Sequence, residues 1–299
     1  MKRTKLYMDT TVEIQVITGS AQESAAAAAL DRAFEAFHKV EQACSRFSPD
    51  SELMQAARQI QTAVPVSPFL YEPLKFALEM AEWTDGLFDP TVGQALENLG
   101  FNEHYLTRQA MHSSTSSSAS YRDIILDEEK HTLYLQKPLV IDLGAVAKGF
   151  AIDLAAHELR AFDGFVVNAG GDLYAGGLNE TGSKWRIGIQ HPVNPEQILY
   201  TIELSNEAIC TSGSYERRSP IHPETHHIID PSSTESPQEM VSCSVIAPYA
   251  MMADAFSTAS FLSGVEHGTA LIDQVKLKGL FITSDLTSVT LGGIHIEKG

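Results

Sequence analysis

Two motifs within residues 141–177 carry most of what this sequence predicts. The first is Ile141-Asp-Leu-Gly-Ala-Val-Ala-Lys-Gly149, and the second is Asn168-Ala-Gly-Gly-Asp172. The first is typical of the start of an amphipathic helix flanked by glycines, with the cation Lys148 in its first turn. In the second, the pair Gly170-Gly171 lets backbone approach a ligand where a Cβ would obstruct it. The stretch therefore predicts a phosphate-binding cradle.

The carboxylates of Asp142 and Asp172 bracket this cradle in a strongly acidic chain. Lys and Arg number 21 against 38 Asp and Glu, which gives a formal net charge of −17. Such a surface disfavours binding to nucleic acid or to an anionic membrane. An anionic ligand then needs a local cationic pocket or a divalent metal. The two carboxylates indicate either a metal ion between them or hydrogen bonds to the sugar or ring of the ligand.

Length and composition are those of a soluble globular protein. The 299 residues are 43% hydrophobic and 20% charged, enough for one large core or two modest ones. We expect one domain over residues 1–299, with a flexible Ser-rich loop at about 112–120. Asp9 and Glu13 interrupt any signal-peptide core, and no run approaches transmembrane length, so a cytoplasmic protein is expected.

Two amphipathic helices are predicted in the first hundred residues. Ser20 and Glu23 have the spacing of a capping box, and apolar residues then recur at helical spacing as far as Cys44. Because Cys44 belongs to this apolar stripe, a core position is preferred over a reactive thiol. A second helix is predicted from Ser67-Pro68, ending by Gly86.

The remaining pattern favours an α+β fold with mixed or antiparallel sheets and packed helices. Residues 123–127 and 132–135 predict a hairpin, and further helical runs are expected at 251–262 and 269–275. Short strands are expected at Phe165–Asn168, Trp185–Ile189, Leu199–Leu204, Ala208–Thr211 and Val241–Ile246. Strands and helices do not alternate strictly, as they would in a doubly wound sheet.

Asp254 and Thr258 have i, i+4 spacing within a predicted helix, so their oxygens project from one helix face. A small set of hard oxygen ligands suits Mg²⁺, which keeps some of its water and completes its shell with substrate phosphate. The alternative is structural, with Thr258 bonded back to the helix and Asp254 acting as a cap. Spacing alone leaves both interpretations open.

The histidines near residue 225 do not predict a zinc site. His222 and His226 have i, i+4 spacing, but Pro223 disfavours helical backbone at His222, so a loop or strand entry is expected. His227 precedes a short strand-like piece, Ile228-Ile-Asp-Pro231. A histidine at such an edge is either a general base or a solvated side chain.

In order along the chain, these segments resemble the ApbE family of FAD:protein FMN transferases. The resemblance covers nearly the whole chain and rests on eight motifs in register. They are Tyr7–Thr10, Ser45–Glu52, Phe88–Gly93, Ile141–Gly149, Asn168–Asp172, Thr211–Arg217, His227–Pro231 and Ala253–Thr258.

The resemblance implies an ApbE-like fold with an FAD site between two lobes, and an enzyme that takes FAD and Mg²⁺. It implies transfer of FMN through a phosphoester to a threonine hydroxyl of a target flavoprotein, with release of AMP. By motif, Asp254, Thr258 and the carbonyl of Ala145 are expected to bind Mg²⁺, and His227 to act as the base. The residues expected to contact or shape the FAD site are Met8, Phe47, Leu99, Gly100, Phe101, Asp142, Lys148, Asn168, Gly170, Gly171, Asp172 and Thr211.

The chain departs from the family pattern after Asp230-Pro231. The family commonly has a short turn containing Thr-Gly before a proline, whereas Ser232-Ser-Thr-Glu-Ser-Pro237 is one residue longer and has no glycine. The acceptor-facing loop is therefore expected to differ. Two alternatives share the same residues: an FAD pyrophosphatase that yields FMN and AMP, and an FAD-binding protein without catalysis.

Overall fold

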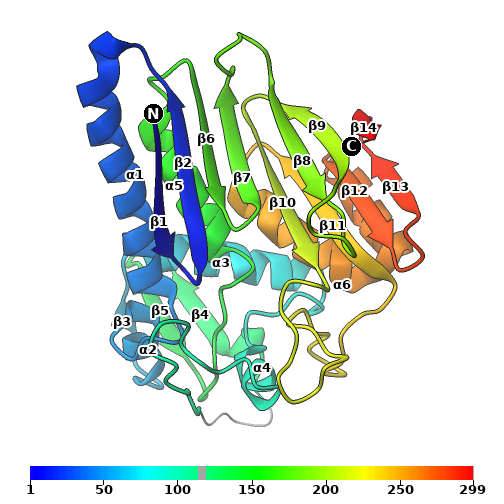
Figure 1. Cartoon of the computed structure of the whole chain (residues 1–299). Coiled ribbons are helices and arrows are strands. Elements are labelled where there is room, and N and C mark those ends of the chain that lie inside the picture. Colours follow the sequence, from blue (N-terminus) through cyan, green and yellow to red (C-terminus); the bar gives the residue numbers. More distant parts are fainter. Residues whose placement is uncertain (114–118, 299) are drawn as a thin grey trace. The chain divides into compact units, whose positions relative to one another are not determined.

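The computed structural model describes residues 1–113 and 119–298, so most of the predicted Ser-rich loop lies outside the described residues. The chain divides into two compact units (Figure 1). The sheet unit comprises Met1–Phe37, Lys148–Tyr215 and Gln238–Gly299, and the helical unit comprises His38–Ala147 and Glu216–Pro237. The single domain expected from the sequence stays a prediction.

An eight-stranded antiparallel sheet forms the centre of the sheet unit. Its order is β1-β2-β6-β7-β10-β11-β12-β13, and Figure 1 shows these strands side by side. Val12, Ile14 and Val16 are fully buried at alternate positions of β2, as expected for a strand with one face in the core. The strands are β1 (Lys2–Tyr7), β2 (Thr10–Ile17), β6 (Gly164–Ala169), β7 (Asp172–Gly177), β10 (Glu207–Gly213), β11 (Met240–Ala247), β12 (Lys278–Thr283) and β13 (Ser288–Leu291).

Both faces of this sheet are covered around β10 and β11. One face packs against a second, three-stranded sheet, β14-β9-β8 (Ile296–Lys298, Ile198–Leu204 and Trp185–Gln190). Trp185, Ile202 and Ile209 belong to the shared core. The other face packs against the helix α6 (Ala250–Gln274). Strands and helices therefore form three layers, and the predicted α+β class is confirmed.

The helices differ from the predicted ones at their ends and faces. α1 (Glu23–Cys44) begins at Glu23, because residues Ser20–Gln22 form a short 3-10 turn. α5 (Ala147–Leu159) begins within the first motif, but only His157 of the helix is exposed, so the expected amphipathic face was wrong. The two helical runs expected after residue 250 form one element, α6, with Gly264 non-helical at φ 76°.

The helical unit confirms the predicted helix after Ser67 and the predicted hairpin. α3 (Pro68–Trp83) begins after Ser67 and places Pro68 in its first turn. β4 (Ile124–Asp127) and β5 (Thr132–Leu135) form the predicted hairpin, which β3 (Val64–Pro65) extends into a three-stranded sheet. Two short helices, α2 (Glu52–Ala57) and α4 (Gly93–Asn98), complete the regular elements of the unit, besides a 3-10 turn at Tyr121–Asp123. Within residues 1–113 and 119–298, no helix is both long and apolar enough to cross a bilayer.

Gly149 sets the closest approach between α5 and α6. A Cβ at this position would lie 2.5 Å from the carbonyl oxygen of Ala250, which is backbone and cannot rotate away. We expect Gly149→Ala to lower the free energy of unfolding by about 1–3 kcal/mol, as other overpacked core positions do. Gly19→Ala is the matched control, since a Cβ there meets nothing within 4 Å. Equal denaturant midpoints for the two variants would contradict this close-contact role.

Candidate functional site

In the sheet unit, one cation joins two buried carboxylates from separate elements. The Nζ of Lys148, in the first turn of α5, donates to Oδ2 of Asp172 at the start of β7. The same Nζ lies 3.5 Å from Oδ2 of Asp254 in α6. Asp172 and Asp254 are each only 5% exposed. The structure therefore brings together three of the residues that the sequence predicted for the site.

Charge within this cluster fixes the protonation of Lys148. Burial alone would lower the pKa of Lys148, but Asp172 and then Asp254 raise it above its usual range. Burial raises the pKa of Asp254; the ammonium group of Lys148 opposes that shift, and Asp172 adds to it. The cluster thus holds two carboxylates and one cation, so a second cation would find a net negative charge there.

Hydroxyl groups extend from this cluster along α6. The Oγ1 of Thr258 lies 3.0 Å from Oγ of Ser212 on β10, which in turn lies 2.9 Å from Oγ of Ser257. Asp254 accepts a hydrogen bond of 3.3 Å from the amide of Gly149 in α5. The structural alternative predicted that Asp254 caps its own helix. In the structure its carboxylate instead accepts a hydrogen bond from Gly149 of α5.

The oxygen donors of this region suit a small hard cation. Asp254 and Thr258 share one face of α6, as their spacing predicted, and offer one carboxylate and one hydroxyl oxygen. Among the described residues no group of three or more His, Cys, Asp or Glu side chains could hold a metal ion. A set so poor in protein ligands suits Mg²⁺, which usually keeps several waters and binds substrate phosphate. Ala145 lies in the helical unit, and its role as a ligand stays a prediction.

The turn between β6 and β7 has the tight geometry that its glycines predicted. Gly170 and Gly171 have φ of 65° and 101°, and the amide of Gly171 donates to Oδ1 of Asn168 over 3.0 Å. A Cβ on Gly170 would lie 2.3 Å from Oγ1 of Thr10, whereas a Cβ on Gly171 would meet nothing within 4 Å. The space at Gly171 is therefore open to a ligand. Asn168 stabilises the turn by accepting the hydrogen bond from the amide of Gly171.

Thr211 and Met8 also lie in the sheet unit. The amide of Thr211 donates to Oδ1 of Asp172 over 2.9 Å, and its Oγ1 lies 2.7 Å from Oγ of Ser244. Both oxygens of Asp172 are therefore bound. Met8 lies between β1 and β2 with a φ of 51°, in the left-handed region that non-glycine residues rarely adopt.

A second set of predicted residues gathers in the helical unit around Arg46. Oδ2 of Asp142 accepts a 2.5 Å hydrogen bond from Nε of Arg46, and Oδ1 accepts one of 2.8 Å from the amide of Gly144. Nη2 of Arg46 donates to the carbonyl oxygen of Phe101 over 2.7 Å. The guanidinium lies 4.0 Å from the ring centroid of Phe47. Phe47, Phe101 and Asp142 therefore share one partner.

The turn Leu99–Phe101 is also held from its other end. The carbonyl oxygen of Leu99 accepts a 2.6 Å hydrogen bond from Oγ of Ser219. Gly100 has a φ of 86°, and a Cβ there would lie 2.7 Å from Cγ of Pro220. The glycine is required both by the backbone angle and by the close approach of the 219–222 segment.

His227 lies in irregular backbone, so the strand-like piece expected at residues 228–230 was wrong. The imidazole lies edge-on to the ring of Phe101, with centroids 6.5 Å apart. It is half-buried, not solvated, and its Nδ1 is buried without a hydrogen-bond partner among the described residues. Burial first, then the charge of Arg217 and the neighbouring His226, lowers its pKa to about 4. His227 is therefore neutral at physiological pH, as a general base must be.

His226 is a structural histidine. It is fully buried, and its Nε2 lies 3.0 Å from the carbonyl oxygen of Pro237. The amide of Ile228 donates to Nδ1 over 3.3 Å, so Nε2 carries the proton. Both ring nitrogens are occupied, in agreement with the expectation that His222 and His226 form no zinc site.

Arg46 and Ser212 are two polar residues of these clusters to which the sequence assigned no role. Arg46 stands inside the motif Ser45–Glu52 and Ser212 inside Thr211–Arg217. An arginine between a serine and an aromatic residue carries no spacing signal of its own. The one available signal was position, since both residues adjoin predicted contact residues.

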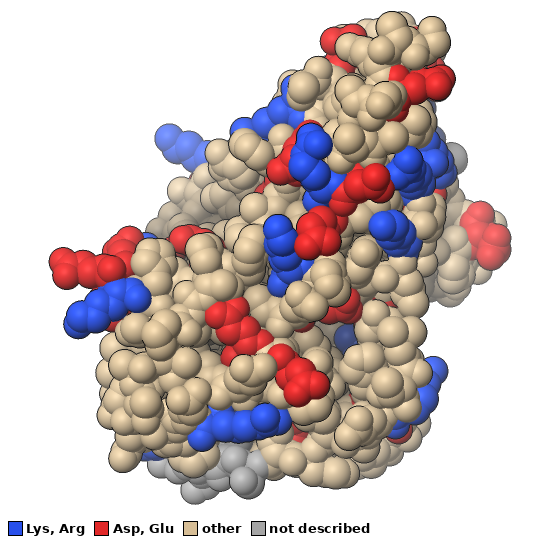
Figure 2. Space-filling view, turned by 90° about the vertical axis from the view of Figure 1, so that its left-hand side faces the viewer, with Lys and Arg blue, Asp and Glu red and all other residues tan. Residues whose placement is uncertain are grey.

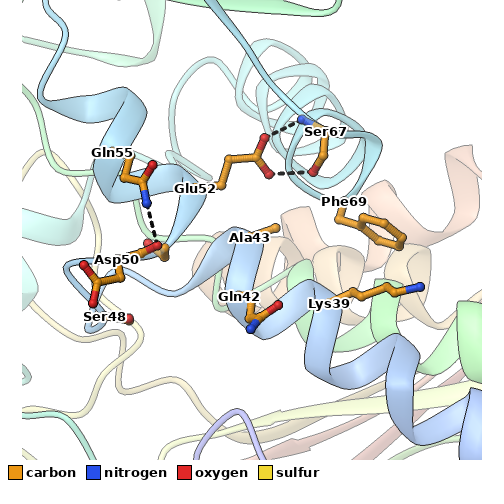
Figure 3. A pocket seen from close by; sticks show the side chains of 10 residues that line it. Lys39, Gln42, Ala43, Ser48, Asp50, Glu52, Gln55, Ser67 and Phe69 are labelled. Atoms are coloured by element: carbon orange, nitrogen blue, oxygen red, sulfur yellow. Dashed lines mark hydrogen bonds between the residues drawn. The ribbon is translucent and has the colours of Figure 1, made fainter.

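A cavity of about 470 Å³ opens elsewhere in the helical unit. Figure 3 shows that Glu52 points across it to Ser67, whose amide and hydroxyl both donate to the Glu52 carboxylate. Gln55 bonds to the carbonyl of Asp50. None of the predicted site residues lines this cavity, and these polar groups already bond to one another. It is therefore not the site described above.

The face drawn in Figure 2 carries no single-sign charged patch, because acidic and basic side chains are interspersed on it. Surface side chains of opposite charge also pair with each other, as in Arg3–Asp31 and Arg32–Glu158. The charges that matter for chemistry are the buried ones.

The longer loop after Pro231 places a β-branched residue in a strained conformation. Thr234 has a φ of 60° and is exposed, and its amide donates to the carbonyl of Asp230 over 2.8 Å. We expect Thr234→Gly to stabilise the protein by about 1 kcal/mol, because relief of left-handed strain exceeds the added chain entropy of glycine. Ser233→Gly, where no positive φ occurs, should be neutral or destabilising. A lower thermal midpoint for Thr234→Gly than for Ser233→Gly would contradict the strain argument.

Comparisons with known proteins agree on one family. A family model described as "ApbE family" matches residues 8–281. The FAD:protein FMN transferase of Escherichia coli K12 is 30% identical over 259 residues, which are 82% of this chain and 74% of that protein. The relative of the same name from Treponema pallidum is 31% identical over 283 residues, covering 86% and 78%.

Solved structures show the same likeness. The crystal structure of the ApbE protein from Thermotoga maritima matches with a TM-score of 0.83 and 27% identity, covering 97% of this chain and 96% of that one. The flavin transferase ApbE from Vibrio cholerae matches with a TM-score of 0.82 and 25% identity over the same shares.

Proposed function

This chain belongs to the ApbE family, and we propose that it transfers the FMN part of FAD to a threonine hydroxyl of an acceptor flavoprotein, in a reaction that depends on Mg²⁺. The observation that supports this most is the buried cluster of Lys148, Asp172 and Asp254, with the hydroxyl of Thr258 on the same face of α6 as Asp254. It combines a permanent cation with carboxylate and hydroxyl oxygens, as an anionic diphosphate and a divalent ion require.

In the proposed reaction the threonine oxygen attacks the phosphorus on the FMN side of the FAD diphosphate. A new P–O bond forms, the bond to the AMP phosphate breaks, and the hydroxyl proton passes to a base. Such a transfer depends mainly on positioning and on stabilising charge at the phosphate oxygens. Asp254 and Thr258 would hold Mg²⁺, with the carbonyl of Ala145 as the further ligand that the family resemblance implies, and the ion would supply charge neutralisation at the leaving phosphate.

The remaining roles belong to side chains whose protonation the structure supports. Lys148 stays protonated beside two carboxylates and supplies positive charge for the phosphates. His227 is neutral because burial lowers the pKa of its imidazole, so it can accept the proton of the threonine hydroxyl. Asp142 and the turn Leu99–Phe101 supply contacts to the FAD molecule.

Mass spectrometry of a peptide containing the acceptor threonine tests the proposal. Incubation with the purified protein, FAD and Mg²⁺ should make the peptide heavier by one FMN and release one AMP. The same peptide with valine in place of threonine should stay unmodified. Free FMN with an unmodified peptide would show an FAD pyrophosphatase instead. FAD binding without AMP release at any Mg²⁺ concentration would show a binding protein.

A further inference from the structure

Arg46 makes contacts in the helical unit that the proposed function leaves unexplained. Its side chain is 4% exposed and bonds through Nε to Asp142 and through Nη2 to the carbonyl of Phe101. It also lies over the ring of Phe47. Phe47, Phe101 and Asp142 are separate in sequence, yet each is predicted to contact FAD. One buried guanidinium thus links three expected contact points.

Lysine cannot reproduce these contacts. A guanidinium is a planar fork that reaches a carboxylate and a carbonyl at the same time and stacks on a ring, whereas an ammonium is a point charge. Burial alone would raise the pKa of Asp142, but Arg46 and the amide of Gly144 hold it below its usual value. Arg46 therefore keeps Asp142 ionised and fixes the direction of its carboxylate.

The third guanidinium nitrogen, Nη1, separates a positioning role from simple structural support. Nη1 is buried without a hydrogen-bond partner among the described residues and lies 3.9 Å from Oε1 of Glu97. A buried donor without a partner is costly. Replacing the ion pair by apolar residues would remove that cost, as it often does elsewhere. The charged arrangement is therefore not explained by stability alone.

We propose that Arg46 is a positioning residue for FAD, which sets Phe47, the turn Leu99–Phe101 and the carboxylate of Asp142 in the arrangement that binds the nucleotide. This proposal rests on the proposed function, because it takes FAD as the ligand. The turn is held at one end by Arg46 through Phe101 and at the other by Ser219 through Leu99. Loss of either hydrogen bond should loosen the turn Leu99–Phe101.

Titration of the purified protein with FAD, followed by flavin fluorescence, tests the role of Arg46. Arg46→Lys should weaken FAD binding about tenfold, the equivalent of about 1.4 kcal/mol. In the transfer assay the KM for FAD should rise by a similar factor, while kcat at saturating FAD changes by less than about twofold. If Arg46 were merely structural, Arg46→Lys would lower the thermal midpoint but would not raise the KM for FAD while leaving kcat nearly unchanged.

Arg122→Lys is the matched control in the same unit. Arg122 also stacks on an aromatic ring, with its guanidinium 4.5 Å from the centroid of Tyr121, and pairs with Asp85 at 3.1 Å. It is exposed and touches none of the predicted contact residues, so Arg122→Lys should bind FAD as the wild type does.

Ser219→Ala tests the same turn with Arg46 intact. It should also weaken FAD binding, so a folded Ser219→Ala protein with wild-type affinity overturns the proposal even where Arg46→Lys does not fold. Wild-type affinity in a folded Arg46→Lys protein overturns it too. A wild-type protein that binds no FAD at all would remove the proposed function itself, which is a distinct result.

Discussion

Replacing Asp254 by asparagine should reduce the kcat/KM of FMN transfer by about a thousandfold, because a metal ion contributes several kcal/mol of charge stabilisation in such reactions. Asparagine has nearly the same shape, so Gly149 keeps a hydrogen-bond acceptor in α6. It removes the negative charge that draws a cation to the cluster, while Lys148 retains its bond to Asp172. The loss should therefore come from the metal and not from collapse of the helix.

The measurement is the transfer rate across a series of Mg²⁺ concentrations. Asp254→Asn should need much more Mg²⁺ for half-maximal activity and stay below the wild-type rate at saturation. Asp273→Asn is the control, because Asp273 belongs to the same helix and is exposed at its far end. If Asp254→Asn shows the wild-type dependence on Mg²⁺, Asp254 is not a ligand of the metal.

Local sequence signals predicted the elements whose core face repeats regularly. The helix after Ser67 and the hairpin formed by β4 and β5 are present as expected. β2 was not predicted, although its buried valines and isoleucine alternate with less buried residues as in a strand with one core face. β1 gave no such signal, because Lys2–Tyr7 is an edge strand with mostly exposed, basic residues.

The helix predictions failed where tertiary packing overrode the local pattern. α5 has small residues on several sides and only His157 exposed, so it has no single apolar stripe to detect. For α6 the local pattern was better, because Gly264, with a φ of 76°, forms a kink between two helical stretches. The two predicted runs lie on either side of this kink.

The pairing of charged side chains in the site was also not predictable from the local sequence. The sequence placed Asp142, Lys148, Asp172 and Asp254 in the site, but it did not indicate which side chains pair. The structure pairs Lys148 with Asp172, 24 residues away, and Asp142 with Arg46, 96 residues away. Such pairing depends on strand order and helix packing, which no local pattern encodes.

A pH profile of FMN transfer should distinguish His227 from a histidine of ordinary pKa. Burial, then Arg217 and His226, lowers the pKa of His227 to about 4. A base works in its deprotonated form, so at saturating Mg²⁺, which keeps Asp254 ionised, the rate should stay level from about pH 8 to about pH 5 and fall only as the pH drops through the folded-state pKa of His227. An unperturbed imidazole would lose activity near pH 6.5 instead.

The free energy of unfolding should also depend on pH through the imidazole of His227. The imidazole takes up a proton near pH 6.5 in the unfolded chain, but only near pH 4 in the folded protein. The unfolded state therefore binds more protons between these values, and the free energy of unfolding should fall as the pH drops through them. His227→Ala should remove this part of the pH dependence, which urea denaturation at pH 7 and pH 5 would measure.

His227→Ala should lower the rate of transfer by about a hundredfold to ten-thousandfold, which is the usual contribution of a general base. FAD binding should change little, because the hydrogen bonds that hold Asp142 and the turn Leu99–Phe101 run to Arg46 and Ser219, and the imidazole adds only an edge contact to the ring of Phe101. Single-turnover transfer at saturating FAD and Mg²⁺ separates the two quantities. His222→Ala, at an exposed position of the same segment, is the control. A His227→Ala protein that transfers FMN at the wild-type rate would show that the threonine proton leaves by another route, and that the low pKa of His227 has no role in the reaction.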